Sequence, residues 1–415
     1  MADAKNKESQ SLRKGTDDSD FRQQNIPAWM PILSPVYVIA SFILLAFLLI
    51  PAGLIFLRTS QGIVELVKQY DGDGTENELQ DCKIEVANAG SKCEIEFTIP
   101  ENMTTPIYVY YEIDNFYQNH KKYFGSRDND QVGPRSGPFF LNYHGNVLIT
   151  NVHPFFFLTN AQLRGLSSGL ESSSCPPLHK LKDKSTDKDV LLNPCGFVAN
   201  TFFNDVITLN SVTDSDDNNL NISMREDGIS WVSDLKQKFG QVYGFKSEAC
   251  ASCDDCSCNS TVWSCEEPYI DDNGICHLYF YPDEDTTQYA YETYPMVINP
   301  IEGILNEHFL VWMRTAALPK FRKLYGYIPD SQFKTITKGS VLTFEIETNW
   351  VVSGFAGRKS LVVTESSYMG GRNDFVGWLY IGVGIFCAVA GIFFSIIQVV
   401  APRKLGDKRF LRKFD

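Results

Sequence analysis

Two long apolar segments dominate the hydropathy pattern of the chain. Residues 36–57 and residues 375–401 contain 22 and 27 consecutive residues without a charged side chain. At about 1.5 Å of rise per residue, each is long enough for a hydrocarbon core roughly 30 Å thick. A buried core helix rarely runs this long without a charge, and a cleavable signal peptide has a shorter apolar region nearer the N-terminus. We therefore predict two transmembrane helices, the first an uncleaved signal-anchor.

Basic residues after the second segment set the predicted orientation. The C-terminal tail, residues 402–415, holds six of them, whereas residues 360–374 hold only Arg372. The positive-inside rule places that tail in the cytosol. Two spans put both ends on one side, so the polar tail of residues 1–35 is expected there as well. Residues 58–374 are then one large luminal or extracellular domain.

Small residues form a stripe along the second predicted span. Gly377, Gly384 and Gly391 recur every seven residues, and Ala388 and Ser395 follow the last two glycines at a distance of four. A face of small residues lets another helix backbone approach closely. Glycine is also generally frequent in membrane helices, and this simpler interpretation stays open. The repeat favours packing, and we expect this face to contact a helix of a membrane partner.

Between the spans the pattern has mainly a period of two, which is typical of half-buried strands. Apolar and polar residues alternate over residues 94–99 and 342–347, and further strands are expected at 107–113, 277–281 and 360–364. Strands near both ends of the domain, with long loops between them, favour an antiparallel β-sandwich with minor helices, its first and last strands close to the spans. One helix is expected from Asn306 to Leu318, ended by Pro319.

Cysteine usage agrees with an oxidising compartment. Ten of the eleven cysteines lie in the predicted ectodomain and only Cys387 lies in a span, and an even count of this kind indicates disulfides. Short separations suggest two local pairs, Cys82 with Cys93 and Cys175 with Cys195. The other six lie in one acidic loop whose CxxCxxCxC spacing could also hold zinc. The luminal address favours three disulfides there, formed by Cys250, Cys253, Cys256, Cys258, Cys265 and Cys276.

Three glycosylation sequons begin at Asn102, Asn221 and Asn259, all inside the predicted ectodomain. Residues 58–374 carry 26 basic and 43 acidic side chains, a net charge of −17. This charge repels nucleic acid and anionic lipid headgroups, although it also suits ordinary solvation of a secreted-type domain. Membrane lipids are therefore expected only around the two spans, and no nucleic acid is expected as a partner.

Signatures of catalysis are missing from the sequence. The six histidines show no HExxH spacing, and neither a phosphate-binding GxxxxGK[ST] loop nor a GxSxG nucleophile motif occurs. The segment beginning at Asp214 starts like a calcium loop, but Asn219 replaces the required glycine and Arg225 replaces the final glutamate. We therefore predict neither an enzyme nor a bound cofactor or metal.

Several ordered motifs resemble the accessory β-subunit family of the type IV P-type ATPases that flip phospholipids, known as the Cdc-fifty or ligand-effect-modulator family. They extend from residue 21 to the second span, so the resemblance covers nearly the whole chain. The matching segments are FRQQNIPAW at 21–29, DNFYQNH at 114–120, NPCG at 193–196, ND at 204–205, NEHFLVWMRTAALPKFRKLYG at 306–326, GRKS at 357–360 and MGG at 369–371.

The resemblance implies two spans with cytosolic tails and a glycosylated, mostly β ectodomain whose two disulfides fall on Cys82–Cys93 and Cys175–Cys195. It also implies a protein without catalysis that forms a heterodimer with a flippase ATPase, escorts it out of the endoplasmic reticulum and supports its lipid-transport cycle. Such a protein resides in the endoplasmic reticulum, Golgi, endosome or plasma membrane. Two departures are Val232, where the family often has proline, and the six-cysteine loop.

Two other classes of protein share part of this pattern. A trimeric ligand-gated channel also has two spans and a cysteine-rich ectodomain, but it needs a span with polar positions facing the pore. Only Ser395 and Gln398 are polar deep in the second span. A membrane-anchored ectoenzyme fits less well, because no catalytic site is visible.

Overall fold

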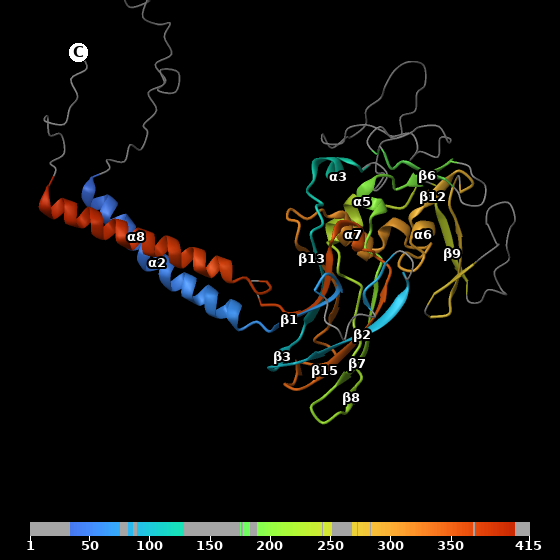
Figure 1. Cartoon of the computed structure of the whole chain (residues 1–415), viewed down its shortest axis with the longest axis horizontal. Coiled ribbons are helices and arrows are strands. Elements are labelled where there is room, and N and C mark those ends of the chain that lie inside the picture. Colours follow the sequence, from blue (N-terminus) through green and yellow to red (C-terminus); the bar gives the residue numbers. More distant parts are fainter. Residues whose placement is uncertain are drawn as a thin grey trace, which may run out of the picture. The chain divides into compact units, whose positions relative to one another are not determined.

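The computed structural model describes residues 34–74, 82–85, 89–127, 175, 177–182, 189–242, 244–250, 268–271, 273–282, 284–367 and 370–402. The chain divides into two compact units, one formed by Met1–Gln61 with Asn373–Asp415 and the other by Gly62–Arg372. The first unit contains the two long helices and the second contains all the strands that the structure describes (Figure 1). We call them the helical unit and the ectodomain.

The helical unit consists of α2 (Pro35–Gln61) and α8 (Asp374–Val400), each 27 residues long. Their mean hydropathies are 2.7 and 2.5, yet only 11% and 17% of their most apolar windows are buried inside the protein. A core helix of a soluble protein would be mostly buried, whereas lipid can cover apolar residues on every side of a helix. Both helices therefore fit membrane spans, at the two predicted places.

The main sheet of the ectodomain joins the first and last strands of the chain. Its order is β1-β16-β4-β13, formed by β1 (Glu65–Gly72), β16 (Arg358–Glu365), β4 (Ile107–Asp114) and β13 (Phe321–Ile328). All its pairings are antiparallel. The register of the first pair runs from Glu65 opposite Thr364 to Gly72 opposite Arg358. The expectation that strands lie beside both spans in sequence is confirmed.

A second four-stranded sheet has the order β2-β15-β7-β8, with β2 (Ser91–Thr98), β15 (Val341–Thr348), β7 (Val206–Thr213) and β8 (Asn219–Leu220). In β2 the side chains at Cys93, Ile95 and Phe97 are buried while their neighbours are exposed, as period-two alternation predicts. The sheet is again antiparallel. The predicted strands at 94–99, 107–113, 277–281, 342–347 and 360–364 are thus all confirmed, with ends that differ by at most three residues.

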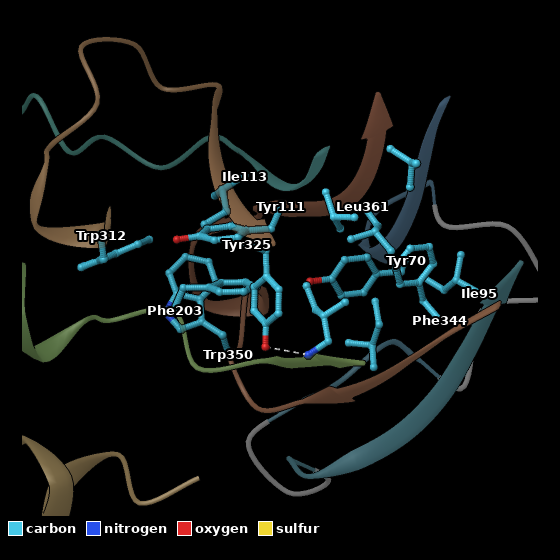
Figure 2. Close-up of a cluster of buried hydrophobic side chains, with 14 of the residues drawn as sticks. Tyr70, Ile95, Tyr111, Ile113, Phe203, Trp312, Tyr325, Phe344, Trp350 and Leu361 are labelled. Carbon is cyan, nitrogen blue, oxygen red and sulfur yellow. Dashed lines mark hydrogen bonds between the residues drawn. The ribbon is translucent and has the colours of Figure 1, made fainter. Parts of the chain in front are cut away.

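One hydrophobic core receives side chains from both sheets, which is the defining feature of a sandwich. Tyr70 and Leu361 point into it from the main sheet, and Ile95 and Phe344 point into it from the second (Figure 2). The rings of Tyr111 and Phe203 stack with centroids 3.9 Å apart. Aromatic side chains bury a large area each, so they contribute much of the stability of this core.

Smaller elements surround the sandwich. Two three-stranded sheets have the orders β10-β11-β9 and β12-β6-β5, and β14 pairs with β3. Their bounds are β3 (Met103–Thr104), β5 (Lys180–Lys182), β6 (Asp189–Asn193), β9 (Lys246–Cys250), β10 (Tyr269–Ile270), β11 (Cys276–Phe280), β12 (Thr287–Tyr289) and β14 (Thr335–Ile336). The short helices are α3 (Lys121–Gly125), α5 (Phe197–Asn200), η4 (Asp234–Lys238), α6 (Ala290–Thr293), η5 (Gly303–Leu305), α7 (Glu307–Met313) and η6 (Ser353–Phe355).

The helix predicted from Asn306 to Leu318 begins at the expected place and ends early. The Asn306 side chain accepts a hydrogen bond from the N–H of Phe309 and so caps the N-terminus of α7. The helix ends at Met313 rather than at Pro319, so the prediction of its C-terminus is wrong. The reason is tertiary: Lys323 and Gln118 take the backbone groups that would have continued the helix, donating to the carbonyl of Val311 and accepting from the N–H of Ala316.

Candidate interaction surfaces

The glycine stripe of α8 packs against α2 of the same chain. A Cβ atom placed on Gly377 would lie 2.9 Å from the backbone of Leu57, and one on Gly384 would lie 2.6 Å from the side chain of Ile50. One on Gly391 would lie 3.1 Å from Ile43. The three glycines are buried. The small-residue face is therefore covered by the first span of the chain itself, where a helix of a partner protein was expected, and Ala388 beside it is half-buried.

Both helices contribute a glycine to their close contact. Gly53 of α2 faces α8, and a Cβ there would lie 2.9 Å from the carbonyl oxygen of Gly377. Two glycines facing each other let two backbones come closer than any larger pair would allow. Sequence reasoning missed Gly53, because a single glycine in a span forms no repeat.

Polar groups join the ends of the two helices. Ser60 Oγ donates a hydrogen bond of 2.5 Å to the carboxylate of Asp374 and accepts one of 2.9 Å from the backbone N–H of Asn373. Asp374 also lies in the first turn of α8, where a negative charge is favourable to the helix dipole. Ser60 is buried, so this contact is part of the packing between the last turn of α2 and the first of α8.

The face of α8 opposite the glycine stripe has a shallow groove centred on Gly382. A Cβ on Gly382 would meet no other atom within 4 Å. The groove is lined by Phe375, Trp378, Leu379, Gly382, Val383 and Phe386. Positions spaced by three and four residues share one side of a helix, so these residues form one aromatic face. This face is large, apolar and exposed within the helical unit.

In the ectodomain a buried ion pair connects two of the motifs singled out in the sequence. Lys359 Nζ lies 2.7 Å from Asp205 Oδ2 and 3.2 Å from Asp71 Oδ2, and all three side chains are almost completely buried. Burial raises the pKa of Asp71, and the nearby ammonium of Lys359 opposes this change. The GRKS and ND motifs therefore meet in the core, where they hold the fold together.

Asp205 also orders the chain around it. Its Oδ1 accepts hydrogen bonds of 2.6 Å from the N–H groups of Asn349 and Trp350, and its Oδ2 accepts one of 2.9 Å from the hydroxyl of Tyr70. Nearby, the Tyr325 hydroxyl accepts a 2.9 Å hydrogen bond from the N–H of Ile207 (Figure 2). A buried carboxylate is tolerated only with such partners.

Lys323, in the long motif at 306–326, closes the end of α7. Its ammonium donates to the carbonyls of Val311 at 3.0 Å, of Trp312 at 3.3 Å and of Arg314. Burial lowers the pKa of Lys323 to about 7, and the charge of Arg314 acts in the same direction. The carbonyl oxygens hold the cation where a helix C-terminus favours positive charge.

The DNFYQNH motif performs a similar local task. Asn115 adopts a left-handed backbone conformation with a φ of 66°, and its side chain donates to the carbonyl of Phe355 at 2.8 Å. Gln118 and Asn119 bond to the backbone of Ala316 and Ala317 at 2.7 and 2.8 Å. These side chains fix the irregular segment that follows α7. The motif thus serves the local fold of the backbone.

The structure joins Cys82 to Cys93 and Cys175 to Cys195, with Cα atoms 5.2 and 5.7 Å apart. Cys276 is disulfide-bonded, and its backbone pairs with that of Cys250 between β11 and β9. Cys253, Cys256, Cys258, Cys265 and the sequon at Asn259 lie outside the described residues. Asn102 and Asn221 are both exposed. Occupancy of the sequons stays a prediction.

Among the residues that the structure describes, no group of three or more His, Cys, Asp or Glu side chains is placed to hold a metal ion. The acidic turn at Asp214 closes on itself, because Asp214 Oδ1 accepts from the N–H groups of Asp216 and Asn218. The polar clusters described above serve the fold. The groove on α8 is a surface within the helical unit that leaves room for another molecule.

The sequence matches the family model described as "LEM3 (ligand-effect modulator 3) family / CDC50 family" over residues 56–138 and 155–404. It is 30% identical to "ALA-interacting subunit 3" of Arabidopsis thaliana, over 95% of this chain and 89% of that protein. It is 30% identical to "Cell cycle control protein 50A" of Mus musculus, over 92% and 88%. It is 28% identical to "Phospholipid-transporting ATPase accessory subunit CRF1" of Saccharomyces cerevisiae, over 97% and 90%.

Proposed function

Because this chain belongs to the LEM3/CDC50 family, we propose that it is a non-catalytic accessory subunit of a P-type ATPase that transports phospholipids. It binds the ATPase as a heterodimer, is required for the ATPase to leave the endoplasmic reticulum, and supports the lipid-transport cycle. The observation that carries this proposal is the extent of the family match, which includes most of the ectodomain and the whole of α8. The relatives include a protein named as an accessory subunit of a phospholipid-transporting ATPase.

The channel alternative has no support from the family or from the relatives. It would also require polar positions along one face of a span, and the exposed face of α8 is aromatic and aliphatic. An accessory subunit, in contrast, needs an apolar surface that a second membrane protein can cover.

We place the membrane contact with the ATPase on the groove around Gly382. The glycine stripe is already covered by α2, so it is not free for a second protein. Helix association in lipid depends on close packing rather than on a hydrophobic driving force. Gly382 provides a depression between the rings of Trp378 and Phe386, and a helix of the ATPase can place a side chain there.

The experiment is recovery of the ATPase with the full-length chain in mild detergent. We expect wild type to recover it, Gly382→Leu to lose most of it, and Ala40→Leu, a similar enlargement at an exposed position of α2, to retain it. If Gly382→Leu recovers as much as wild type, the membrane contact lies elsewhere. If wild type recovers no ATPase, and depleting the chain leaves every phospholipid-transporting ATPase correctly delivered, the accessory-subunit proposal is wrong.

The proposed topology has residues 1–35 and 402–415 in the cytosol and residues 58–374 outside it, in a membrane of the secretory pathway. The basic C-terminal tail and the position of the exposed sequons at Asn102 and Asn221 support this arrangement. Protease added to sealed microsomes should remove epitope tags from both ends and leave the ectodomain intact. A protected C-terminal tag would reverse the orientation.

A further inference from the structure

The ectodomain presents a tryptophan on a tightly held loop, outside every contact described so far. Trp231 and its neighbour Val232 are each 66% exposed, although the residues on either side of them, Ile229 and Asp234, are buried. An exposed tryptophan next to an exposed valine is unusual for a surface that meets only water.

The loop is fixed from below. Glu307, in the first turn of α7, accepts hydrogen bonds of 2.8 and 2.7 Å from the N–H groups of Gly228 and Ser230. The carbonyl of Trp231 accepts from the N–H groups of Asp234 and Leu235 at 2.8 and 3.1 Å. The backbone that carries the tryptophan therefore loses little freedom when something binds to it, which lowers the entropic cost of binding.

Arg314 fixes the ring itself. Its guanidinium carbon lies 4.7 Å from the centre of the Trp231 ring, and its Nε forms an ion pair with the buried carboxylate of Asp234. A cation at this distance from an indole is attracted to the face of the ring. The indole is thus held in one orientation while most of its surface stays open.

Two basic side chains follow Trp231 closely in the sequence, in an ectodomain whose net charge is −17. Lys236 and Lys238 of η4 are exposed, and Lys238 Nζ lies 4.0 Å from Asp234 Oδ1. The acidic side chains of the same segment already have partners: Asp227 with Arg225, Glu226 with His308, and Asp234 with Arg314. The unusual i→i+5 turn of η4, in which the N–H of Phe239 donates to the carbonyl of Asp234 at 2.9 Å, belongs to a class often found at functional sites.

We propose that Trp231, Val232, Arg314, Lys236 and Lys238 form a docking site for an acidic extracytosolic segment of the ATPase partner, an inference that rests on the proposed function. Tryptophan and arginine are the residues that most often dominate binding energy at protein interfaces. Lysines beside them select an acidic segment by charge complementarity. A lipid surface is the less suitable occupant, because negative lipid charge is concentrated in the cytoplasmic leaflet, and the ectodomain is placed on the other side.

The test compares matched variants of the full-length chain in binding to the purified ATPase. Trp231→Ala should weaken binding by about tenfold or more, whereas Met296→Ala, which truncates another exposed apolar side chain, should not. Lys236→Glu should weaken binding most at low ionic strength, whereas Lys334→Glu should leave it unchanged. Arg314 is kept, since its loss would leave Asp234 buried without its partner. Equal thermal stability of all four variants shows that folding is intact.

A second measurement identifies the occupant. The Trp231→Cys variant is labelled with a membrane-impermeant maleimide, in nanodiscs, with and without the ATPase. Protection that requires the ATPase supports the proposal. Equal labelling in both cases overturns it, and so does protection by the nanodisc alone, which would assign the site to the membrane surface. Wild-type chain that fails to bind the ATPase would instead refute the accessory-subunit function, so the two failures are distinguishable.

Discussion

Lys359 and Asp205, which are 154 residues apart in the sequence, form an ion pair 2.7 Å long at the centre of the ectodomain. Lys359 lies on β16, the last strand of the main sheet, and Asp205 directly precedes β7 of the second sheet. Because the pair connects the two layers of the sandwich, it can form only when both layers are in place. Each buried charge is stabilised only while its partner is present.

Removing one partner should therefore destabilise the ectodomain severely. Lys359→Met leaves Asp205 and Asp71 buried without a counter-charge, and breaking a buried pair in this way typically costs about 3 to 5 kcal/mol. The thermal unfolding midpoint of the purified chain should fall well below that of wild type. Lys92→Met, which breaks the exposed pair with Glu345, is the control and should have little effect. Equal midpoints for the two variants would contradict the role assigned to Lys359.

Enlarging the glycine face should separate the two spans. Gly384→Leu introduces a side chain where even a Cβ would lie 2.6 Å from Ile50, so α2 must move away. Cysteines replacing Phe42 and Phe394, whose rings lie 5.9 Å apart, should cross-link in wild type and fail to do so in Gly384→Leu. A protease site engineered in the ectodomain makes the cross-link visible on a gel.

Gly382→Leu is the matched control for this cross-link, because Gly382 faces away from α2. It should cross-link like wild type while losing the ATPase. Loss of the cross-link in both variants would show that a larger side chain on either face of α8 disturbs its packing against α2. The two faces would then not have separate binding partners.

The stability of the protein should depend on pH through Lys323. Its pKa is lowered from the ordinary value near 10.5 to about 7 in the folded protein. Between pH 7 and pH 10.5 the unfolded chain therefore binds a proton at Lys323 that the folded chain does not. The free energy of unfolding then rises with pH across this interval, by at most about 1.4 kcal/mol per pH unit. Below about pH 7 both states are protonated and this dependence ends.

The measurement is the difference in unfolding free energy between wild type and Lys323→Met, taken from pH 7 to pH 10. Subtraction removes the titration of other groups, and the difference should grow in favour of wild type as the pH rises. A difference that stays constant would mean that the ammonium is held charged by its carbonyl partners throughout.

The two described disulfides should both be needed for stability. Cys82–Cys93 closes 11 residues beside the main core, and Cys175–Cys195 closes 20 residues around a small cluster with Leu192. Replacing both cysteines of either pair by serine should cost about 2 to 5 kcal/mol. Microscopy of the tagged variants should show that they are retained in the endoplasmic reticulum instead of reaching the Golgi or the cell surface. Normal delivery of both variants would show that the local packing suffices without them.

Local patterns were enough to predict the strands, since alternation such as that of Ile95 and Phe97 depends only on which face of a sheet is buried. The spans and the position of the glycine face were likewise visible in the sequence. The partner of that face was not, because a row of glycines specifies close approach and carries no information about which helix approaches. The structure assigns that place to Gly53, Ile50 and Ile43.

Contacts between distant residues were beyond sequence reasoning. Nothing near Lys359 indicates that it meets Asp205, and the early end of α7 depends on Lys323, which follows the helix by ten residues. Trp231 was not singled out by sequence reasoning. Only the structure shows that its ring is exposed while the residues beneath it are pinned by Glu307.

Because β1 pairs with β16, the main sheet can be completed only after residues 358–365 have been synthesised. Residues 358–365 fill the gap between β1 and β4, so the main sheet is incomplete in every chain that stops earlier. The same holds for the helical unit, because α2 is made first and has no partner until α8 emerges last. A prematurely terminated product therefore shows an open strand edge and a solitary span, both recognisable to the quality-control machinery of the cell as signs of an unfinished subunit.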